Sequence, residues 1–291
     1  MHRLHAHLVI DRLIERSSPA FGCGIRNLML ATRRRAHRFH YDKDKQQWFV
    51  SERGRNQYFV SRRQGFTDYG PGLESRASDL ARSYRIDRID FANGDVVIDC
   101  GANVGDLSRY FEINNIAVRY IAYEPSPPEA DCLRRNAPNG EINEIGLYRE
   151  TGALDFYISS FGADSSLEPP ADGWTEIIKT RCVSLAHEFE RLGLERVRLL
   201  KLEAEGLEPE ILEGAGPVLN RIDYIAVDGG PERGLKAETT IETLSNTLIG
   251  NGFEMQAIDL ARGWGRALFR NTKAALPEKM ARSKLGHSAP A

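Results

Sequence analysis

Short apolar runs alternate with mixed stretches along the last two thirds of the chain. The runs are rich in Val, Ile and Leu and are too short for helices, so they predict buried strands. These strands fall near 96–99, 119–123, 142–147, 197–203, 223–228, 253–258 and 266–270. The stretches between them predict helices near 105–114, 127–136, 184–192, 207–214 and 238–249. This alternation predicts an α/β fold with a mostly parallel sheet and helices on both faces.

Two connections depart from the alternation. The last two strand runs are joined by DLARGWG at 259–265, which is too short for a helical crossover, so we expect the final strand to be antiparallel. Between the third and fourth runs lies an insertion with strand-like stretches at 154–158 and 177–183. The segment 159–166 between those stretches is rich in Ser and Gly, and we expect it to lie over an active site.

The first third of the chain has a weaker pattern. Residues 1–40 predict one or two basic helices, interrupted near 17–19 and at Gly22, with an apolar face at Leu8, Ile10, Leu13 and Ile14. Weak alternation over 47–61 predicts a β-hairpin, and a loop over 65–72 and a helix over 74–85 follow it. We therefore expect an N-terminal extension of helices and hairpin over 1–90, an α/β domain over 91–276 and a disordered tail over 277–291.

The stretches VVIDCGANVGD at 96–106 and IAYEPS at 121–126 carry the clearest chemical signal. A strand, a glycine turn, a helix and a second strand that ends in Glu124 are the parts of a nucleotide-binding βαβ unit. The Glu124 carboxylate can accept hydrogen bonds from both hydroxyls of a ribose. The glycine spacing is G-x-x-x-G, and Asp99 and Asp106 flank the turn, where they would repel a pyrophosphate. These acids suit a nucleoside with an ammonium group and no phosphate, such as S-adenosylmethionine.

Four blocks of the chain, taken in order, resemble the FkbM family of S-adenosylmethionine-dependent methyltransferases. They are IDCGANVGDLSRYF, YEPSPPEADCLRRN, LLKLEAEGLEPEILEGA and YIAVDGG, and the resemblance covers about residues 85–270. It implies the class I methyltransferase fold, a Rossmann-like sheet of seven strands with the last one antiparallel, and it implies O-methylation. One departure stands in the third block, where the family usually shows Lys-Ile-Asp-Val-Glu-Gly and this chain has Lys-Leu-Glu-Ala-Glu-Gly at 201–206.

Cofactor-binding residues follow from position, because ligands of open parallel sheets bind outside the carboxyl ends of the strands. Glu124 is expected to hold the ribose, Asp99 and the glycine turn to face the methionine portion, and the end of the third strand to flank the adenine, which fits class I methyltransferases. The predicted set is Asp99, Gly101, Ala102, Asn103, Gly105, Glu124, Pro125, Gly146 and Leu147.

The predicted catalytic residues are Lys201, Glu203 and Glu205. Their spacing of two places them on one face of a strand. A carboxylate at this edge could remove the proton of an acceptor hydroxyl, provided that burial or the neighbouring acid raises its pKa. Lys201 would hold the carboxylates by charge pairing.

A metal alternative uses Glu203 and Asp228 as ligands of Mg²⁺, because some related sugar O-methyltransferases hold such an ion against the acceptor hydroxyls. The longer Glu203 in place of Asp leaves the base and the metal assignments open.

Composition excludes several classes of function. A net charge of −2 argues against a general nucleic-acid binder. The four cysteines lack metal-like spacing and indicate reduced thiols, and without a long apolar run or a signal peptide we expect a cytoplasmic protein. Residues 1–63 hold 14 Lys and Arg against 5 Asp and Glu, densest at Arg33–Arg35. This region is either a solvated basic face or a peripheral surface for anionic lipid or a lipid-linked glycan at the inner face of the membrane.

Three functions remain after these observations. The first is an S-adenosylmethionine-dependent O-methyltransferase acting on a hydroxyl of a sugar, a glycan or another small polar natural product. The second is an NAD(P)-dependent oxidoreductase, against which the missing G-x-G-x-x-G counts. The third is a non-catalytic protein that keeps the fold and binds a glycan or a partner. The sequence assigns neither the acceptor nor an oligomeric state.

Overall fold

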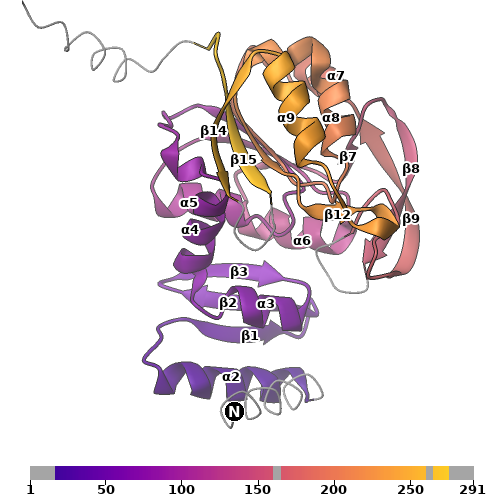
Figure 1. Cartoon of the computed structure of the whole chain (residues 1–291). Helices are drawn as coiled ribbons and strands as arrows, with labels where there is room; N and C mark the ends of the chain where they lie inside the picture. Colours follow the sequence, from indigo (N-terminus) through magenta and orange to yellow (C-terminus); the bar gives the residue numbers. More distant parts are fainter. Residues whose placement is uncertain (1–16, 160–164, 260–264, 275–291) are drawn as a thin grey trace, which may run out of the picture.

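A seven-stranded sheet lies at the centre of the computed structural model, which describes residues 17–159, 165–259 and 265–274 (Figure 1). Its strand order is β14-β15-β11-β10-β4-β5-β6. The strands, in sequence order, are β4 (Val96–Cys100), β5 (Arg119–Tyr123), β6 (Glu141–Asn143), β10 (Val197–Leu202), β11 (Ile222–Asp228), β14 (Phe253–Asp259) and β15 (Arg266–Asn271).

The sheet has the predicted directions. The strands from β6 to β11 are mutually parallel, whereas β15 runs antiparallel to both β11 and β14. The α/β class and the antiparallel strand near the edge, which the resemblance implied, are therefore confirmed. The predicted connection over 259–265 lies outside the described residues, apart from its two ends.

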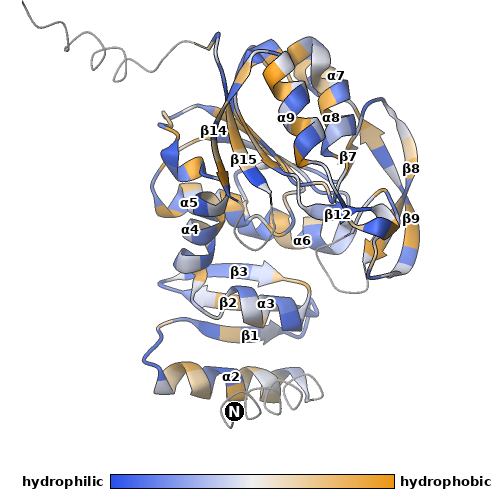
Figure 2. Ribbon diagram, viewed as in Figure 1, coloured by the Kyte–Doolittle hydropathy of each residue, from blue (hydrophilic) through white to orange (hydrophobic). Residues whose placement is uncertain are grey.

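Helices cover both faces of the sheet, and its strands are therefore buried on both sides. Ile98 and Leu200 belong to one apolar cluster, and their neighbours Val97 and Leu199 belong to the other. Figure 2 shows hydrophobic and hydrophilic turns on α8 and α9, as expected for helices with one face on a sheet. The core helices are α5 (Asp106–Ile113), α6 (Pro127–Asn136), α7 (Leu185–Arg191), α8 (Glu208–Ala215) and α9 (Ile241–Gly250).

The third predicted strand is divided between two sheets. Its first part is β6, and its last part is β7 (Gly146–Leu147), which pairs with β9 (Trp174–Val183) of the insertion. β9 also pairs antiparallel with β8 (Gly152–Ser159), so the two strands predicted in the insertion are confirmed. The structure describes only the ends of the predicted loop over 159–166, because residues 160–164 lie outside the described ranges.

The N-terminal segment differs from its prediction in three places. The hairpin is present as β2 (Gln47–Glu52) and β3 (Arg55–Phe59), but β1 (Arg38–Asp42) adds an unpredicted third strand. α2 (Pro19–Thr32) runs through Gly22, so the predicted break there is wrong. Where a loop was expected, α3 (Arg62–Asp68) forms, since Ser61 caps it and Phe66 is buried. The amphipathic face predicted around 8–14 lies outside the described residues.

This segment is joined to the core through α4 (Leu73–Ser83), whose Leu80 and Ala81 pack in the same apolar cluster as the central sheet. A second junction is polar. The Asn136 side chain at the end of α6 donates to the carbonyl of Tyr58 at 2.8 Å and accepts from its N–H at 2.7 Å. All four cysteines are free thiols. Within the described ranges, no helix is long and apolar enough to cross a bilayer.

Candidate active site

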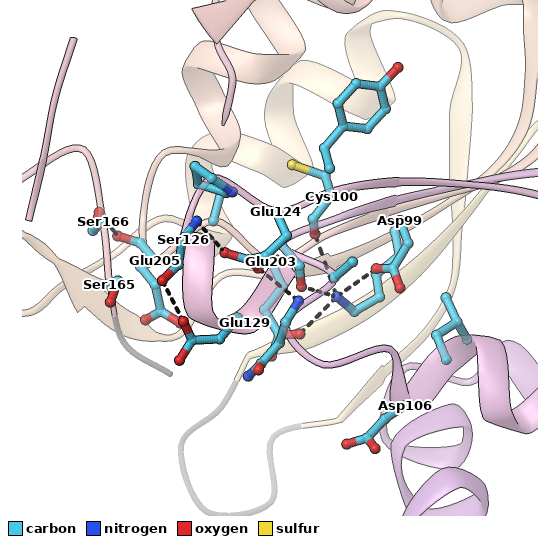
Figure 3. Close-up of a pocket in the computed structure, with 18 of the residues that line it drawn as sticks. Asp99, Cys100, Asp106, Glu124, Ser126, Glu129, Ser165, Ser166, Glu203 and Glu205 are labelled. Atoms are coloured by element: carbon cyan, nitrogen blue, oxygen red, sulfur yellow. Dashed lines mark hydrogen bonds and ion pairs between the residues drawn. The ribbon is translucent and has the colours of Figure 1, made fainter. Parts of the chain in front are cut away.

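A cavity of about 510 Å³ lies where the parallel strands β4, β5 and β10 end (Figure 3). Most of the predicted site residues line it: Asp99, Gly101, Ala102, Asn103, Glu124, Pro125, Gly146, Leu147, Lys201, Glu203 and Glu205. Two predicted residues are not among the lining residues, Gly105 and Asp228. Ser165 and Ser166 approach on the side of Glu205, and Asp106 lies on the opposite side (Figure 3).

Glu124 is held by the main chain at the end of β5. Its carboxylate accepts hydrogen bonds from the N–H of Asn103 at 2.8 Å and the N–H of Ser126 at 2.9 Å. The residue is 7% exposed, and no described residue makes an ion pair with it. Burial raises the pKa of Glu124 to about 8 and outweighs the two N–H donors. The carboxyl therefore faces the cavity from a fixed position, with acceptor capacity left for the hydroxyls of a ligand.

The two glycines of the turn are explained by packing within the protein. Both have positive φ, +68° at Gly101 and +88° at Gly105. A Cβ on Gly101 would lie 1.7 Å from the carbonyl oxygen of Glu203, and one on Gly105 would lie 2.7 Å from Cδ1 of Leu133. Gly101 therefore allows the loops after β4 and β10 to touch, and Gly105 allows α5 to approach α6. The prediction that Gly105 contacts the cofactor is not supported by this geometry.

Lys201 ties two strand ends together. Its Nζ lies 3.1 Å from Oδ1 of Asp99 and 2.8 Å from Oε2 of Glu203, and it donates to the carbonyl of Gly101 at 3.2 Å. The lysine side chain is 2% exposed and that of Asp99 is 1% exposed. Tyr120 donates to the other oxygen of Asp99 at 2.5 Å. The predicted charge pairing by Lys201 is thus present, and the Asp99 carboxylate is occupied by protein groups.

Glu203 has a second cation. The Arg266 guanidinium lies 3.1 Å from Oε1 of Glu203 and 2.5 Å from Oδ2 of Asp228. Burial alone would raise the pKa of Glu203, but Lys201 and Arg266 outweigh it and lower this pKa to about 2. The sequence expectation of a raised pKa at Glu203 is therefore wrong, since the neighbouring charges are cationic.

The Arg266 guanidinium also lies where the metal alternative would place Mg²⁺, between Glu203 and Asp228. Arg266 bridges the two predicted Mg²⁺ ligands, Glu203 and Asp228, so a positive group already lies between their carboxylates. Within the described residues, no group of three or more His, Cys, Asp or Glu side chains is arranged to hold a metal ion. This arrangement does not support the predicted metal site.

Glu205 does not share a strand face with Lys201. β10 ends at Leu202, and Glu205 lies in the following turn with a left-handed backbone at φ +52°. The spacing of two therefore stops applying after the strand. Glu205 still lines the cavity, and its carbonyl accepts from the hydroxyl of Ser166 at 3.4 Å.

Sequence reasoning missed two contributions to the cavity. Glu232, in the short β12 (Pro231–Arg233), lines it four residues after Asp228. Burial raises the pKa of Glu232 to about 9, and the nearby acids Asp228, Glu203 and Glu208 add to this while Arg266 opposes it. The block YIAVDGG that precedes Glu232 was the available signal. The other contribution comes from Gln64, Asp68 and Arg76 of the N-terminal segment, for which the sequence offers no motif.

Strand order, the antiparallel β15 and a cavity at the strand ends define a class I methyltransferase fold. A family model described as the methyltransferase FkbM domain matches residues 99–245, about half of the chain. The chain belongs to this family of methyltransferases. The matched region holds the glycine turn, Glu124 and the Lys201–Glu203 pair.

Individual relatives are distant. AmbE, the AMB antimetabolite synthetase of Pseudomonas aeruginosa, is 28% identical over 55% of this chain, which spans 10% of that protein. The methyltransferase sdnD of Sordaria araneosa is 29% identical over 40% of this chain and 59% of its own length. The 2-O-methyltransferase NoeI of Sinorhizobium fredii is 23% identical over 74% of this chain and 95% of its own.

The chain thus spans less than two thirds of the first two relatives. Among solved structures, TrmK of M. capricolum in complex with S-adenosyl-homocysteine has a TM-score of 0.40 and 10% identity, covering 69% of this chain and 71% of that one.

Proposed function

We propose that this protein transfers a methyl group from S-adenosylmethionine to a hydroxyl of a sugar, a glycan or another small polar molecule. The observation that carries the proposal is the single cavity that joins the glycine turn and Glu124 to the carboxylates beyond β10 and β11. Membership of a methyltransferase family supports the reaction class, and the name of NoeI, a 2-O-methyltransferase, supports oxygen as the acceptor atom.

The residues present suit a nucleoside at one end of the cavity. Glu124 accepts only main-chain N–H groups and is free to accept two ribose hydroxyls as well. Gly146 and Leu147 of β7 line the cavity beside Ile145 and Phe156, which offers an apolar surface for adenine. When bound, the sulfonium supplies an activated methyl group, whose bond to sulfur breaks as the bond to the acceptor oxygen forms.

At the other end, the chain must orient the acceptor and take its proton. Glu203, fixed by Lys201 and Arg266, is a weak base because its pKa is about 2, and we assign it to orientation. Glu232 has no described cation in contact and lines the same cavity. We assign the proton acceptor to Glu232, while Glu205 stays the sequence-based alternative.

Calorimetric titration with S-adenosylhomocysteine and with NAD tests the proposal. We expect binding of S-adenosylhomocysteine and none of NAD, because the turn has the spacing G-x-x-x-G and lacks the G-x-G-x-x-G that places a pyrophosphate on a helix N-terminus. NAD binding would favour the oxidoreductase. Tight S-adenosylhomocysteine binding without turnover on any hydroxylated acceptor would favour the non-catalytic alternative. Activity that survives EDTA is expected, and a loss restored by Mg²⁺ would reinstate the metal mechanism.

A further inference from the structure

The N-terminal segment supplies part of the cavity. Gln64 and Asp68 of α3 and Arg76 of α4 line it together with Asn103 of the glycine turn. The same four residues are among those that line a smaller recess. The segment that precedes the methyltransferase-family match therefore reaches the end of the site where the glycine turn lies.

Arg76 is held at this end by a polar network. Its Nε donates to Oδ2 of Asp106 at 2.7 Å, and Asp106 also accepts from the Tyr69 hydroxyl at 2.6 Å and from the Gln57 amide at 3.3 Å. Asp68 lies farther away, with Oδ2 at 3.8 Å from Nη2 of Arg76. Within the described part of the chain, these contacts use Nε and Nη2, so the guanidinium keeps donors for a ligand.

Arg76 is also the most open cation of the cavity. Three described cationic residues line it: Arg76, Lys201 and Arg266. Lys201 is 2% exposed and Arg266 is 16% exposed, and each makes close ion pairs with two carboxylates. The side chain of Arg76 is 31% exposed. An anionic group entering the cavity would therefore reach Arg76 more easily than Lys201 or Arg266.

A carboxylate of similar openness lies next to it. The side chain of Asp68 is 27% exposed, and the 3.8 Å separation from Arg76 is too long for a hydrogen bond. By contrast, Asp99, which the sequence suggested for the methionine portion, is 1% exposed and occupied by Lys201 and Tyr120. An open cation and an open anion side by side match the two charges of an α-amino acid.

We propose that Arg76 and Asp68 bind the amino-acid group of the cofactor, Arg76 its carboxylate and Asp68 its ammonium. The proposal rests on the proposed use of S-adenosylmethionine and assigns the N-terminal segment to the cofactor site. A guanidinium pairs with a carboxylate through two parallel N–H donors, which a single lysine ammonium cannot reproduce. Asp106 positions Arg76 for this contact through the bond to Nε.

The test compares two ligands that share the nucleoside and the thioether. S-adenosylhomocysteine carries the amino-acid group, and 5′-methylthioadenosine lacks it. Calorimetry should show that Arg76→Gln lowers the affinity for S-adenosylhomocysteine by about 10-fold to 100-fold, because a charge-assisted pair is lost. Binding of 5′-methylthioadenosine should change less than about twofold on the same scale. Asp68→Asn should show the same selectivity with a smaller loss.

Arg82→Gln is the matched control. Arg82 lies on the same helix, makes an exposed ion pair with Asp79 and does not line the cavity, so both ligands should bind it as they bind the wild type. An Arg76→Gln variant that keeps full S-adenosylhomocysteine affinity overturns the proposal. So does an equal loss of both ligands, which indicates that Arg76 only supports the fold. Wild-type protein that binds neither ligand refutes the proposed function itself.

Discussion

Glu203 and Glu124 occupy comparable places and have opposite environments. Each follows a buried parallel strand, and each lines the cavity. Glu203 contacts two cations and has a pKa of about 2, whereas Glu124 contacts only main-chain N–H groups and has a pKa of about 8. The difference shows that the cations in contact, Lys201 of the same strand and Arg266 of β15, and not the position in the motif, decide which carboxylate remains open to a ligand.

The largest predicted effect is on the free energy of unfolding, when Lys201, a cation that Glu203 contacts and Glu124 does not, is replaced. Lys201→Met removes one partner from the buried Asp99 and one from Glu203, whose side chain is 25% exposed, and breaking a buried pair costs about 3–5 kcal/mol. Denaturant unfolding measures this loss. Lys179→Met is the control, because Lys179 makes an exposed pair with Asp155 and should cost at most about 1 kcal/mol. Similar losses in both variants would contradict the account.

The second predicted effect is on kcat, through the group that accepts the proton of the acceptor hydroxyl. Glu232→Gln should lower kcat by about 10²-fold to 10³-fold, because the amide cannot accept the proton of the acceptor hydroxyl. In the wild type, kcat should rise with pH toward about 9, the pKa of Glu232, since only the ionised form acts as a base. Glu205→Gln should retain most of the activity. A large loss in that variant, with Glu232→Gln near wild type, would move the base to Glu205.

The third effect separates Glu124 from Glu203 by pH. Glu124→Gln should weaken S-adenosylhomocysteine by at least about tenfold, since hydrogen bonds to a charged acceptor contribute about 1.5–3 kcal/mol each. Wild-type affinity should increase as pH rises through about 8, because the ionised carboxylate is the stronger acceptor. The raised pKa means that the ionised form is disfavoured in the folded state, so the contribution of Glu124 to stability falls as pH rises from about 4.3 to about 8 and stays lower above that.

Calorimetry across this range gives the affinities. The change of S-adenosylhomocysteine affinity with pH should vanish in Glu124→Gln. It should persist in Glu203→Gln, because Glu203 stays ionised across this range. A wild-type affinity that does not change between pH 6 and pH 9 would show that Glu124 does not titrate in the site.

The smallest effect lies outside the cavity. α2 exposes Phe21 by 60% and Leu28 by 68%, and the exposed Arg33–Arg35 follow it. We expect weak co-sedimentation with anionic vesicles at low salt, lost in salt, because each basic residue near such a surface contributes about 1 kcal/mol. Replacing Phe21 and Leu28 by Ser should weaken it while S-adenosylhomocysteine binding persists. Wild-type protein that never co-sediments at low salt ends this idea.

The central sheet could be predicted because its strands are buried on both faces. Val97 and Ile98 lie in different apolar clusters, and such runs of consecutive apolar residues stand out in a sequence. β1 was missed because RFHYD buries only Phe39 fully and reads as polar. The split between β6 and β7 was missed because Gly146 and Leu147 pair with β9, a partner about 35 residues away that no local pattern reveals.

The site was predictable only as far as its motif residues. Glu124, Lys201 and Glu203 were expected in the cavity and lie there. Their charge states could not be read from the motif, because Arg266 reaches Glu203 from a strand 63 residues further along the chain. Arg76 and Asp68 belong to helices whose sequences show only ordinary surface polarity. Ion pairs between residues far apart in the chain cannot be predicted from a single sequence.

Asn136 carries a consequence for how the chain is made. Its amide pairs with both main-chain groups of Tyr58, as a neighbouring strand would, and so covers the outer edge of β3. The two residues are 78 positions apart. A ribosome that adds roughly 5–20 residues per second needs roughly 4–16 seconds to synthesise the residues between them. Until Asn136 has been made, the outer edge of β3 lacks this partner and is open to pairing with another chain.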